Sequence, residues 1–484
     1  MRDSLRGRTA RRRAGVLLCA TLAATVAQAQ PATRAGAAVP SATSRPPNIL
    51  LIAADDLGYG DLGSYGHHTI KTPVLDRLAR EGLRFTSYYA ASPLCSPSRA
   101  AMLTGRTPFR TGIESWIPEG TAVQLGPREI TLATLLKRRG YATYLSGKWH
   151  LNGGLDVAAH TQPRDHGFDH SLAFHAFAIP THHNPENFFR DGKPLGRIEG
   201  YAARIVVDQA MSWLQTRPPD KPFFLYVAFA EPHGTIASPD FFNELYSGFT
   251  RGRPEPFPNG AAPPSNLAAR GPGEYYANVT HMDSEIGRLL ESLDRLSLRD
   301  DTVVVFTSDN GPVTEDWRHW YEVNLYGSTG GLRGRKADLY EGGIRVPAIV
   351  RWPGHVAAGT ETDVPVIGYD LLPTLAAVAG AAVPRDRPID GEDVSAVLRG
   401  EPFARQRPLY WEFEDDQGFH YALRDGRWKL LADRSLVRRR LYDLVRDRFE
   451  VEERAAQEPG LVVSLAARLR RLAADVAGDP LRPR

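Results

Sequence analysis

Side chains able to do chemistry follow four separate apolar stretches of the sequence. The stretches are 49–54, 141–145, 223–229 and 302–307, and the residues after them are Asp55 and Asp56, Lys148 and His150, Glu231 and His233, and Asp309 and Asn310. In open α/β sheets, ligands bind beyond the carboxyl ends of the strands. One such pair would be explained by helix capping, but four pairs at one edge predict a functional site.

Two of these pairs offer only oxygen ligands to a metal ion. Asp55, Asp56, Asp309 and Asn310 suit Ca²⁺ or Mg²⁺, and we expect Ca²⁺ because an acid-rich, multidentate site fits the larger ion. Zinc is disfavoured because the set lacks histidine or cysteine companions. The alternative is a carboxylate pair neutralised by arginine.

A cysteine stands beside the start of a predicted helix. Ser96 suits the N-cap, Pro97 the first helical position and Gly105 the end, so that Arg99 lies about one turn after Cys95. The helix N-terminus and the arginine make this place electropositive. The pattern predicts a low-pKa thiolate or an oxyanion site.

The order of the elements predicts the fold that positions these residues. Apolarity that is continuous along a stretch favours parallel strands covered on both faces. Helical patterns alternate with the stretches, at 73–81, 96–103, 132–139, 202–214 and 275–296. This alternation predicts a doubly wound α/β sheet, interrupted by a long surface loop at 251–273.

The composition shifts near Gly400. Beyond it, short apolar segments at 409–413, 420–423 and 428–431 predict a small antiparallel sheet, and 461–472 has the pattern of an amphipathic helix. We therefore expect a small C-terminal α+β domain.

The N-terminus has the features of an export signal. Residues 1–29 comprise a basic region, an apolar run at 14–26 and a small-residue cleavage site, and residues 30–46 form a flexible tether. A lipoprotein anchor on Cys19 is disfavoured because Leu18 precedes it. Removing the signal leaves Cys95 as the single cysteine, so the exported chain has no internal disulfide.

Charge and hydropathy exclude two classes of partner. Without the six arginines and one aspartate of the signal, 53 basic residues face 55 acidic ones, which gives no footprint for nucleic acid. No later stretch reaches about 18 uninterrupted apolar residues, so we expect no membrane span.

The segment around Cys95 resembles the signature of the type I sulfatase family, Cys-x-Pro-x-Arg with a Thr-Gly-Arg ending. The resemblance extends over most of residues 47–450, through Ser-Gly-Lys-Trp-His, Thr-Ser-Asp-Asn-Gly and Gly-Leu-Arg-Gly-Arg-Lys. It implies an alkaline-phosphatase-like fold: a large mixed, mostly parallel sheet between helices over 47–400, with a small antiparallel C-terminal domain over 401–484.

The resemblance also implies roles for individual residues. A maturation enzyme would oxidise Cys95 to Cα-formylglycine. Metal binding would fall to the modified Cys95 and the four oxygen-bearing residues, and sulfate handling to Arg99, Lys148, His150, His233 and Lys336. Two loops depart from the family pattern. Many members have a proline two residues after the histidine that corresponds to His233, and glycine is common at the position of Asn152.

The implied mechanism follows from the chemistry of a hydrated aldehyde. One hydroxyl, made acidic by Ca²⁺, would attack sulfur, while Lys148 and Lys336 hold the sulfate oxygens and His233 protonates the leaving oxygen. His150 would then take a proton from the second hydroxyl, so that sulfate leaves and the aldehyde returns. A serine lacks the second hydroxyl.

These observations predict an exported, periplasmic or secreted sulfatase of the arylsulfatase and N-acetylgalactosamine-6-sulfatase branch. We expect a sulfated saccharide as substrate, cleaved at a chain end, with walls for one sugar supplied by residues 175–189 and 316–326. Candidate contacts outside the motifs are His182, His183, Trp317, Trp320 and Tyr321. The alternatives are a phosphonate or phosphate ester hydrolase of the same superfamily, and an inactive sulfated-glycan binding protein.

The first prediction concerns Cys95 in protein made by the native host. We expect mass spectrometry of the peptide spanning Cys95 to find an aldehyde in place of the thiol, because a lone thiol in this motif is the substrate of maturation. Fully active enzyme that carries only free thiol at this position would contradict the prediction.

Overall fold

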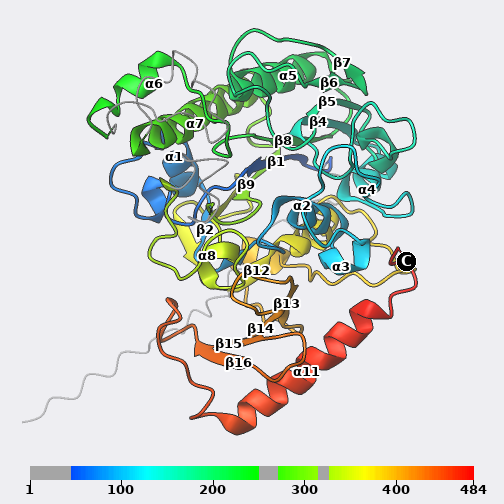
Figure 1. Cartoon of the computed structure of the whole chain (residues 1–484). Coiled ribbons are helices and arrows are strands. Elements are labelled where there is room, and N and C mark those ends of the chain that lie inside the picture. The colour runs from blue at the N-terminus through cyan, green and yellow to red at the C-terminus, as the bar shows by residue number, and fades with distance from the viewer. Residues whose placement is uncertain (1–44, 250–270, 314–325, 484) are drawn as a thin grey trace, which may run out of the picture. The chain divides into compact units, whose positions relative to one another are not determined.

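The main sheet has parallel strands at its centre (Figure 1). The computed structural model describes residues 45–249, 271–313 and 326–483. Within them, ten strands pair in the order β11-β2-β10-β9-β1-β8-β4-β5-β6-β7. The five central strands are parallel: β9 (Thr302–Ser308), β1 (Asn48–Ala54), β8 (Phe223–Ala228), β4 (Ala142–Lys148) and β5 (His170–Phe174). The first four overlap the predicted apolar stretches, although β4 begins one residue later and β8 ends one residue earlier than predicted.

Shorter strands complete the sheet on both sides. They are β10 (Ala348–Arg351), β2 (Leu83–Phe85), β11 (Thr360–Thr362), β6 (Phe189–Arg190) and β7 (Lys193–Pro194). Strand β10 runs antiparallel to β9, and β6 antiparallel to β5, so the sheet is mixed and mostly parallel, as the fold class predicted. None of these five strands was predicted, because runs of two to four residues carry little periodicity. A separate pair joins β3 (Tyr88–Tyr89) to β12 (Val366–Ile367).

Each face of the sheet is covered by helices. Side chains of β1 alternate between two cores, with Ile49 and Leu51 in one and Leu50 and Ile52 in the other, because successive side chains of a strand point to opposite faces. Helices α2 (Cys95–Thr104), α4 (Leu132–Arg138) and α9 (Leu371–Val378) contribute to the first core. Helices α1 (Pro73–Glu81), α5 (Ala202–Thr216) and α7 (Pro272–Arg295) contribute to the second.

The strand register brings the functional segments to one edge. Strands β1 and β9 are in register up to their last residues, Ala54 and Ser308. Gly147 of β4 lies opposite Ala228, the last residue of β8. Since these strands are parallel, the polar residues that follow them emerge at the same edge of the sheet.

Several predicted segments differ from the structure or lie outside the described residues. Helix α7 begins at Pro272, inside the predicted loop, because proline suits the first helical turn. Residues 1–44 and 250–270, which include the predicted signal, most of the tether and most of that loop, are outside the described part. Four further helices are only four or five residues long: α3 (Pro108–Thr111), α6 (Asp240–Glu244), α8 (Glu341–Ile344) and α10 (Ser395–Leu398). None of the described helices has the length and apolarity needed to cross a membrane.

The C-terminal segment forms the predicted antiparallel sheet with one more strand. The order is β13 (Leu409–Glu412), β14 (Tyr421–Asp425), β15 (Trp428–Ala432) and β16 (Arg439–Asp443), followed by α11 (Pro459–Ala477). One face packs on α11, through residues such as Tyr410 and Leu469. The other face, with Trp411, shares a core with Tyr89 and Tyr369. Residues 45–484 thus form one compact unit, and the domain boundary at 400 stays a prediction.

A buried ion-pair cluster connects this sheet to the main body. The ammonium of Lys429 on β15 lies 2.9 Å from Glu341 Oε1 and 2.9 Å from Glu450 Oε1, and all three side chains are fully buried. The second carboxylate oxygen of Glu341 accepts a hydrogen bond from Arg345 Nε at 2.7 Å. Burial raises the pKa of Glu450 to about 7, while Lys429 and Arg345 lower that of Glu341 to about 2 against the effect of burial.

Lys429→Met is expected to destabilise the protein strongly. It leaves two buried glutamates without their shared cation, and breaking a buried ion pair costs about 3–5 kcal/mol. The control is Lys137→Met, which removes an equally short pair to Asp169 at 2.8 Å on the exposed surface and should cost less than about 1 kcal/mol. Chemical denaturation measures both free energies of unfolding, and equal losses would show that the buried cluster does not hold the sheet in place.

Candidate active site

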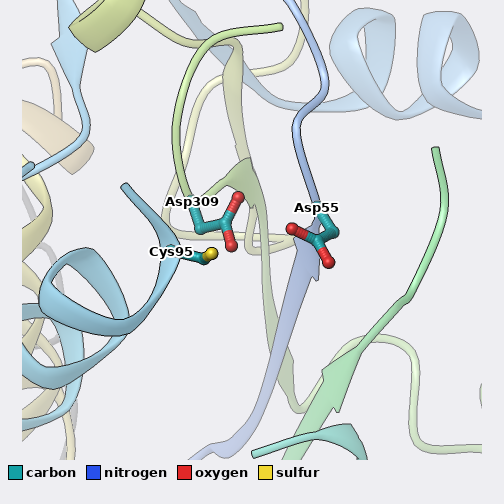
Figure 2. A group of neighbouring side chains, drawn as sticks. All are labelled: Asp55, Cys95 and Asp309. Atoms are coloured by element: carbon teal, nitrogen blue, oxygen red, sulfur yellow. The ribbon is translucent and has the colours of Figure 1, made fainter. Parts of the chain in front are cut away.

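The acidic residues that follow β1 and β9 form one buried group. Asp56 N–H donates to Asp309 Oδ1 at 3.2 Å, and Asn310 Nδ2 donates to Asp56 Oδ1 at 2.6 Å. Potential ligand atoms of Asp55, Cys95 and Asp309 lie within 4.8 Å of one another. Figure 2 shows these three side chains converging from two strand ends and the start of α2.

The donor set fits a hard metal cation. Asp55 Oδ1, Asp56 Oδ2 and Asn310 Oδ1 are buried and have no hydrogen-bond partner among the described residues. Oxygens left unpaired in a buried site are costly, and a cation coordinated by oxygen ligands would satisfy them. His233 also lies within ligand distance of Asp55 and Asp56, although the sequence analysis gave it no metal role.

Each of the three carboxylates has its own basic partner. Lys148 Nζ donates to Asp55 Oδ2 at 2.6 Å, and Lys336 Nζ donates to Asp56 Oδ1 at 2.5 Å. Asp309 pairs with the buried guanidinium of Arg99, whose Nε donates to Asp309 Oδ2 at 2.9 Å. An arginine therefore pairs with Asp309, while lysines pair with Asp55 and Asp56. The alternative of a carboxylate pair neutralised by arginine stays a prediction.

The thiol of Cys95 differs electrostatically from its sequence-based prediction. Cys95 is the first residue of α2 and 4% exposed. Burial raises the pKa of the thiol, and the nearby charges of Lys148 and Lys336 offset this only in part. The predicted low-pKa thiolate is therefore wrong, because desolvation outweighs the nearby positive charges of the two lysines.

The start of α2 also differs from prediction. The N-cap is Leu94, not Ser96, and Ser96 Oγ instead accepts a hydrogen bond from Ile117 N at 3.1 Å. Pro97 consequently sits in the first turn but not at its first position. Gly105 ends the helix as predicted, in a left-handed conformation with φ of 70°.

His150 has a defined tautomer. Its Nε2 lies 3.1 Å from the carbonyl of Ile117, so Nε2 carries the proton and Nδ1 keeps its lone pair. His150 Nδ1 is buried without a hydrogen-bond partner among the described residues. Burial, with the charge of Lys148, lowers the pKa of His150 well below its usual value. A neutral imidazole with an open lone pair is suited to accept a proton.

The backbone from the end of β4 to His150 adopts conformations that few residue types tolerate. Gly147 has φ of 116°, and a Cβ at this position would lie 1.8 Å from the carbonyl oxygen of Ala228. His150 itself has φ of 53°. Strained backbone of this kind persists where surrounding structure holds it, often at functional sites.

His233 points its Nε2 nitrogen toward Asp56. Its Nδ1 donates to the carbonyl of Gly234 at 2.6 Å, and its Nε2 lies 3.7 Å from Asp56 Oδ2. Burial lowers the pKa of His233, whereas the charges of Asp56 and Asp55 raise it. Proton donation from Nε2 therefore depends on nearby negative charge.

Sequence reasoning missed residues that lie within the site. Tyr226 accepts a hydrogen bond from Arg99 Nη1 at 3.3 Å, but its position inside an apolar strand gave no indication of this. His175 was placed only in a predicted sugar wall. Its ring lies edge-on to His150, with centroids 5.1 Å apart, and Nε2 donates to Asn152 O at 2.7 Å.

The other predicted contacts have different surroundings. His182 is fully buried, 3.5 Å from Glu231 Oε1, and is therefore not an exposed loop residue. His183 is partly buried and stacks on Tyr201, and His166 packs beside Trp149. The predicted contacts Trp317, Trp320 and Tyr321 lie outside the described residues.

Comparison with known proteins agrees with this site. A family model described as Sulfatase matches residues 47–381, and a second, described as N-sulphoglucosamine sulphohydrolase, C-terminal, matches residues 335–475. The chain belongs to the sulfatase family. This sulfatase is thus a sulfuric ester hydrolase by family, as the signature around Cys95 predicted.

The chain is similar in sequence to several named sulfatases. It is 39% identical to arylsulfatase A of Bos taurus over 80% of this chain and 75% of the relative. It is 36% identical to steryl-sulfatase of Mus musculus, over 80% and 70%. It is 34% identical to N-acetylgalactosamine-6-sulfatase of Homo sapiens, over 77% and 69%. The predicted resemblance to the arylsulfatase and N-acetylgalactosamine-6-sulfatase branch is confirmed.

A solved structure shares the whole architecture. The crystal structure of Ps i-CgsB in complex with k-i-k-neocarrahexaose matches with a TM-score of 0.74 and 28% identity, over 88% of this chain and 93% of that one.

Replacing Asp309 by alanine tests the geometry of the site. The change removes the carboxylate that pairs with fully buried Arg99, and loss of a buried partner costs about 3–5 kcal/mol. We expect a lower midpoint of thermal unfolding and a fall of at least about 100-fold in hydrolysis of 4-nitrophenyl sulfate. Exposed Asp220→Ala is the control and should change neither. Normal turnover by Asp309→Ala would contradict the assignment.

Proposed function

We propose that this sulfatase is an exported, Ca²⁺-dependent enzyme that removes sulfate from a sulfated saccharide, using formylglycine derived from Cys95. The observation that carries the proposal is the convergence of Cys95, Asp55 and Asp309 within 4.8 Å, together with the unpartnered Nδ1 of His150. A nucleophile precursor, a cation-binding group and a proton acceptor meet at one edge of the sheet.

The proposed ligands of Ca²⁺ are Asp55, Asp56, Asp309, Asn310 and position 95. The bound cation and the hydrated aldehyde supply an acidified hydroxyl nucleophile. Arg99 holds the Asp309 carboxylate in place through a hydrogen bond, and Arg99 in turn donates a hydrogen bond to the Tyr226 hydroxyl.

The basic residues receive the sulfate group. Lys148 and Lys336 each lie on a carboxylate, and their ammonium groups can turn to the equatorial oxygens, where negative charge collects during transfer. Three carboxylates and three basic side chains already balance. A divalent cation therefore adds positive charge that an anionic sulfate ester offsets.

Two histidines transfer protons in two different steps of the reaction. His233 Nε2 donates a proton to the departing ester oxygen, and the sulfate group itself favours its protonated form. His150 Nδ1 accepts a proton from position 95 when sulfate is expelled. The lowered pKa of His150 keeps it in the neutral form that this step requires.

A saccharide substrate follows from several features taken together. The near-neutral net charge of the chain suits a compact pocket that binds one anionic group better than a long cationic groove that binds many. One relative is an N-acetylgalactosamine-6-sulfatase, and one similar structure holds a neocarrahexaose. Partly buried Phe177, three residues after the end of β5, lies beside His233, where the alcohol part of a substrate would leave. Cleavage at a chain end fits a site of this kind.

The remaining assignments rest on the sequence. The signal at 1–29 supports export to the periplasm or outside the cell, and a maturation enzyme acting on the Cys95 motif is the proposed partner. We also propose a catalytic domain over 47–400 and a C-terminal domain over 401–484, whose cluster around Lys429 anchors the loop that carries Lys336.

Metal analysis tests the proposed cofactor. We expect about one calcium ion per chain by elemental analysis, because the donors are all oxygen and acid-rich. Asp55→Ala should lose the calcium, and exposed Asp220→Ala should keep it. Stoichiometric zinc without calcium in active protein would refute the assignment.

A substrate panel tests the proposed reaction. Sulfated monosaccharides, short oligosaccharides and an intact sulfated polysaccharide are compared with matched phosphate esters and a steryl sulfate. We expect release of sulfate from the short saccharides and slower release of phosphate, because the chain belongs to the sulfatase family. Activity confined to steryl sulfates would overturn the saccharide assignment, and faster phosphate release would overturn the proposed reaction.

A further inference from the structure

An aromatic ring lies flat against the histidine that donates the leaving-group proton. The rings of Phe177 and His233 are parallel to within 3°, with centroids 5.9 Å apart. This is an offset stacked arrangement, within the range that such pairs adopt. Phe177 comes three residues after the end of β5 and is partly buried, while His233 is 6% exposed.

The segment that carries Phe177 is braced against the segment that carries His233. Asn187 Nδ2 donates to the carbonyl of Phe177 at 2.8 Å, which closes the loop from its far side. Thr235 Oγ1 donates to Pro180 O at 2.9 Å, and the carbonyl of Thr235 accepts from His182 N at 3.1 Å. The two loops therefore hold the stacked rings in a fixed relation.

The orientation of His233 decides where its proton goes. Its Nδ1 is fixed by Gly234 O at 2.6 Å, while Nε2 lies 3.7 Å from Asp56 Oδ2, just beyond hydrogen-bond distance. A tilt of the ring toward Asp56 would direct the proton to that carboxylate and away from the substrate. A flat ring stacked against the imidazole opposes this tilt.

We propose that Phe177 is a positioning residue that fixes the imidazole plane of His233 for proton donation to the departing ester oxygen. The inference rests on the proposed sulfatase reaction and adds to it a residue outside the sulfatase motifs. In the balanced step, the oxygen of position 95 attacks after losing its proton, a new S–O bond forms to it, the S–O bond to the leaving oxygen breaks, and the Nε2 proton moves to the leaving oxygen.

The consequence is a dependence on the leaving group. 4-Nitrophenolate departs without a proton, whereas a more basic phenolate or a sugar alkoxide needs one as it leaves. Loss of the correct ring orientation should therefore slow the poor leaving groups selectively. Misplacement of a catalytic group by about 1 Å can cost up to about 100-fold, so we expect about tenfold for Phe177→Ala on phenyl sulfate.

The experiment measures kcat/KM for aryl sulfates of increasing phenol pKa, from 4-nitrophenyl to phenyl and 4-methoxyphenyl sulfate. Each variant is made in full length and matched for formylglycine content by mass spectrometry. For Phe177→Ala we expect less than about a twofold loss on the 4-nitrophenyl ester and a steeper dependence on phenol pKa. Phe177→Trp, which keeps a flat ring, should restore the shallow dependence of the natural protein.

Two further variants separate positioning from general structure. In a His233→Ala background, Phe177→Ala should add no further steepness, because the proton donor is already absent. Trp352→Ala removes another aromatic ring stacked on a histidine, His355, at 3.9 Å between centroids, beyond the opposite edge of the sheet. It should leave the dependence on phenol pKa unchanged.

The outcomes distinguish this inference from the proposed function. Equal losses across the whole series, or a rise in KM without a change in the dependence on phenol pKa, would overturn the positioning role and make Phe177 a substrate wall. Failure of the natural, formylglycine-bearing protein to hydrolyse any sulfate ester would overturn the proposed function instead.

Discussion

The architecture depends on holding three buried aspartates at one edge of a parallel sheet. Asp55, Asp56 and Asp309 are at most 1% exposed, and like charges this close repel unless cations compensate them. Lys148, Lys336 and Arg99 each supply one positive charge by direct contact. Because these bases come from three other segments, the whole sheet register must be correct before the charges balance. The same balance makes the site receptive to a further cation and an anionic ester.

The loop around Lys336 shows how distant segments meet this requirement. The backbone of Lys336 donates to Pro312 O at 2.8 Å, and Ala337 donates to Pro93 O at 3.1 Å, so the loop joins the strand end of Asp309 to the segment before Cys95. A few residues later, the N–H of Glu341 donates to Glu450 Oε2 at 2.7 Å. The C-terminal segment therefore supports this loop through Glu450, which in turn pairs with Lys429 on β15.

Much of this arrangement was predictable because strong local patterns coincide with it. Continuous apolar stretches located four of the five central strands, all but β5, and polar residues after them located the site edge. Properties set by distant contacts were not predictable. The tautomer of His150 depends on the carbonyl of Ile117, and burial by the surrounding elements reversed the expected pKa shift of Cys95. The short flanking strands, of two to four residues, form by pairing with neighbouring strands that lie far away in the sequence or carry no periodic signal themselves.

The central claim is that position 95 attacks sulfur and that its second hydroxyl is required to release sulfate. The most direct test is Cys95→Ser, in which the introduced serine has one hydroxyl and no second one. After incubation with 4-nitrophenyl sulfate, peptide mass spectrometry should find sulfate retained on position 95, with a single release of 4-nitrophenol and no continued turnover. Sustained turnover by this variant, or nitrophenol release with position 95 unmodified, would contradict the account.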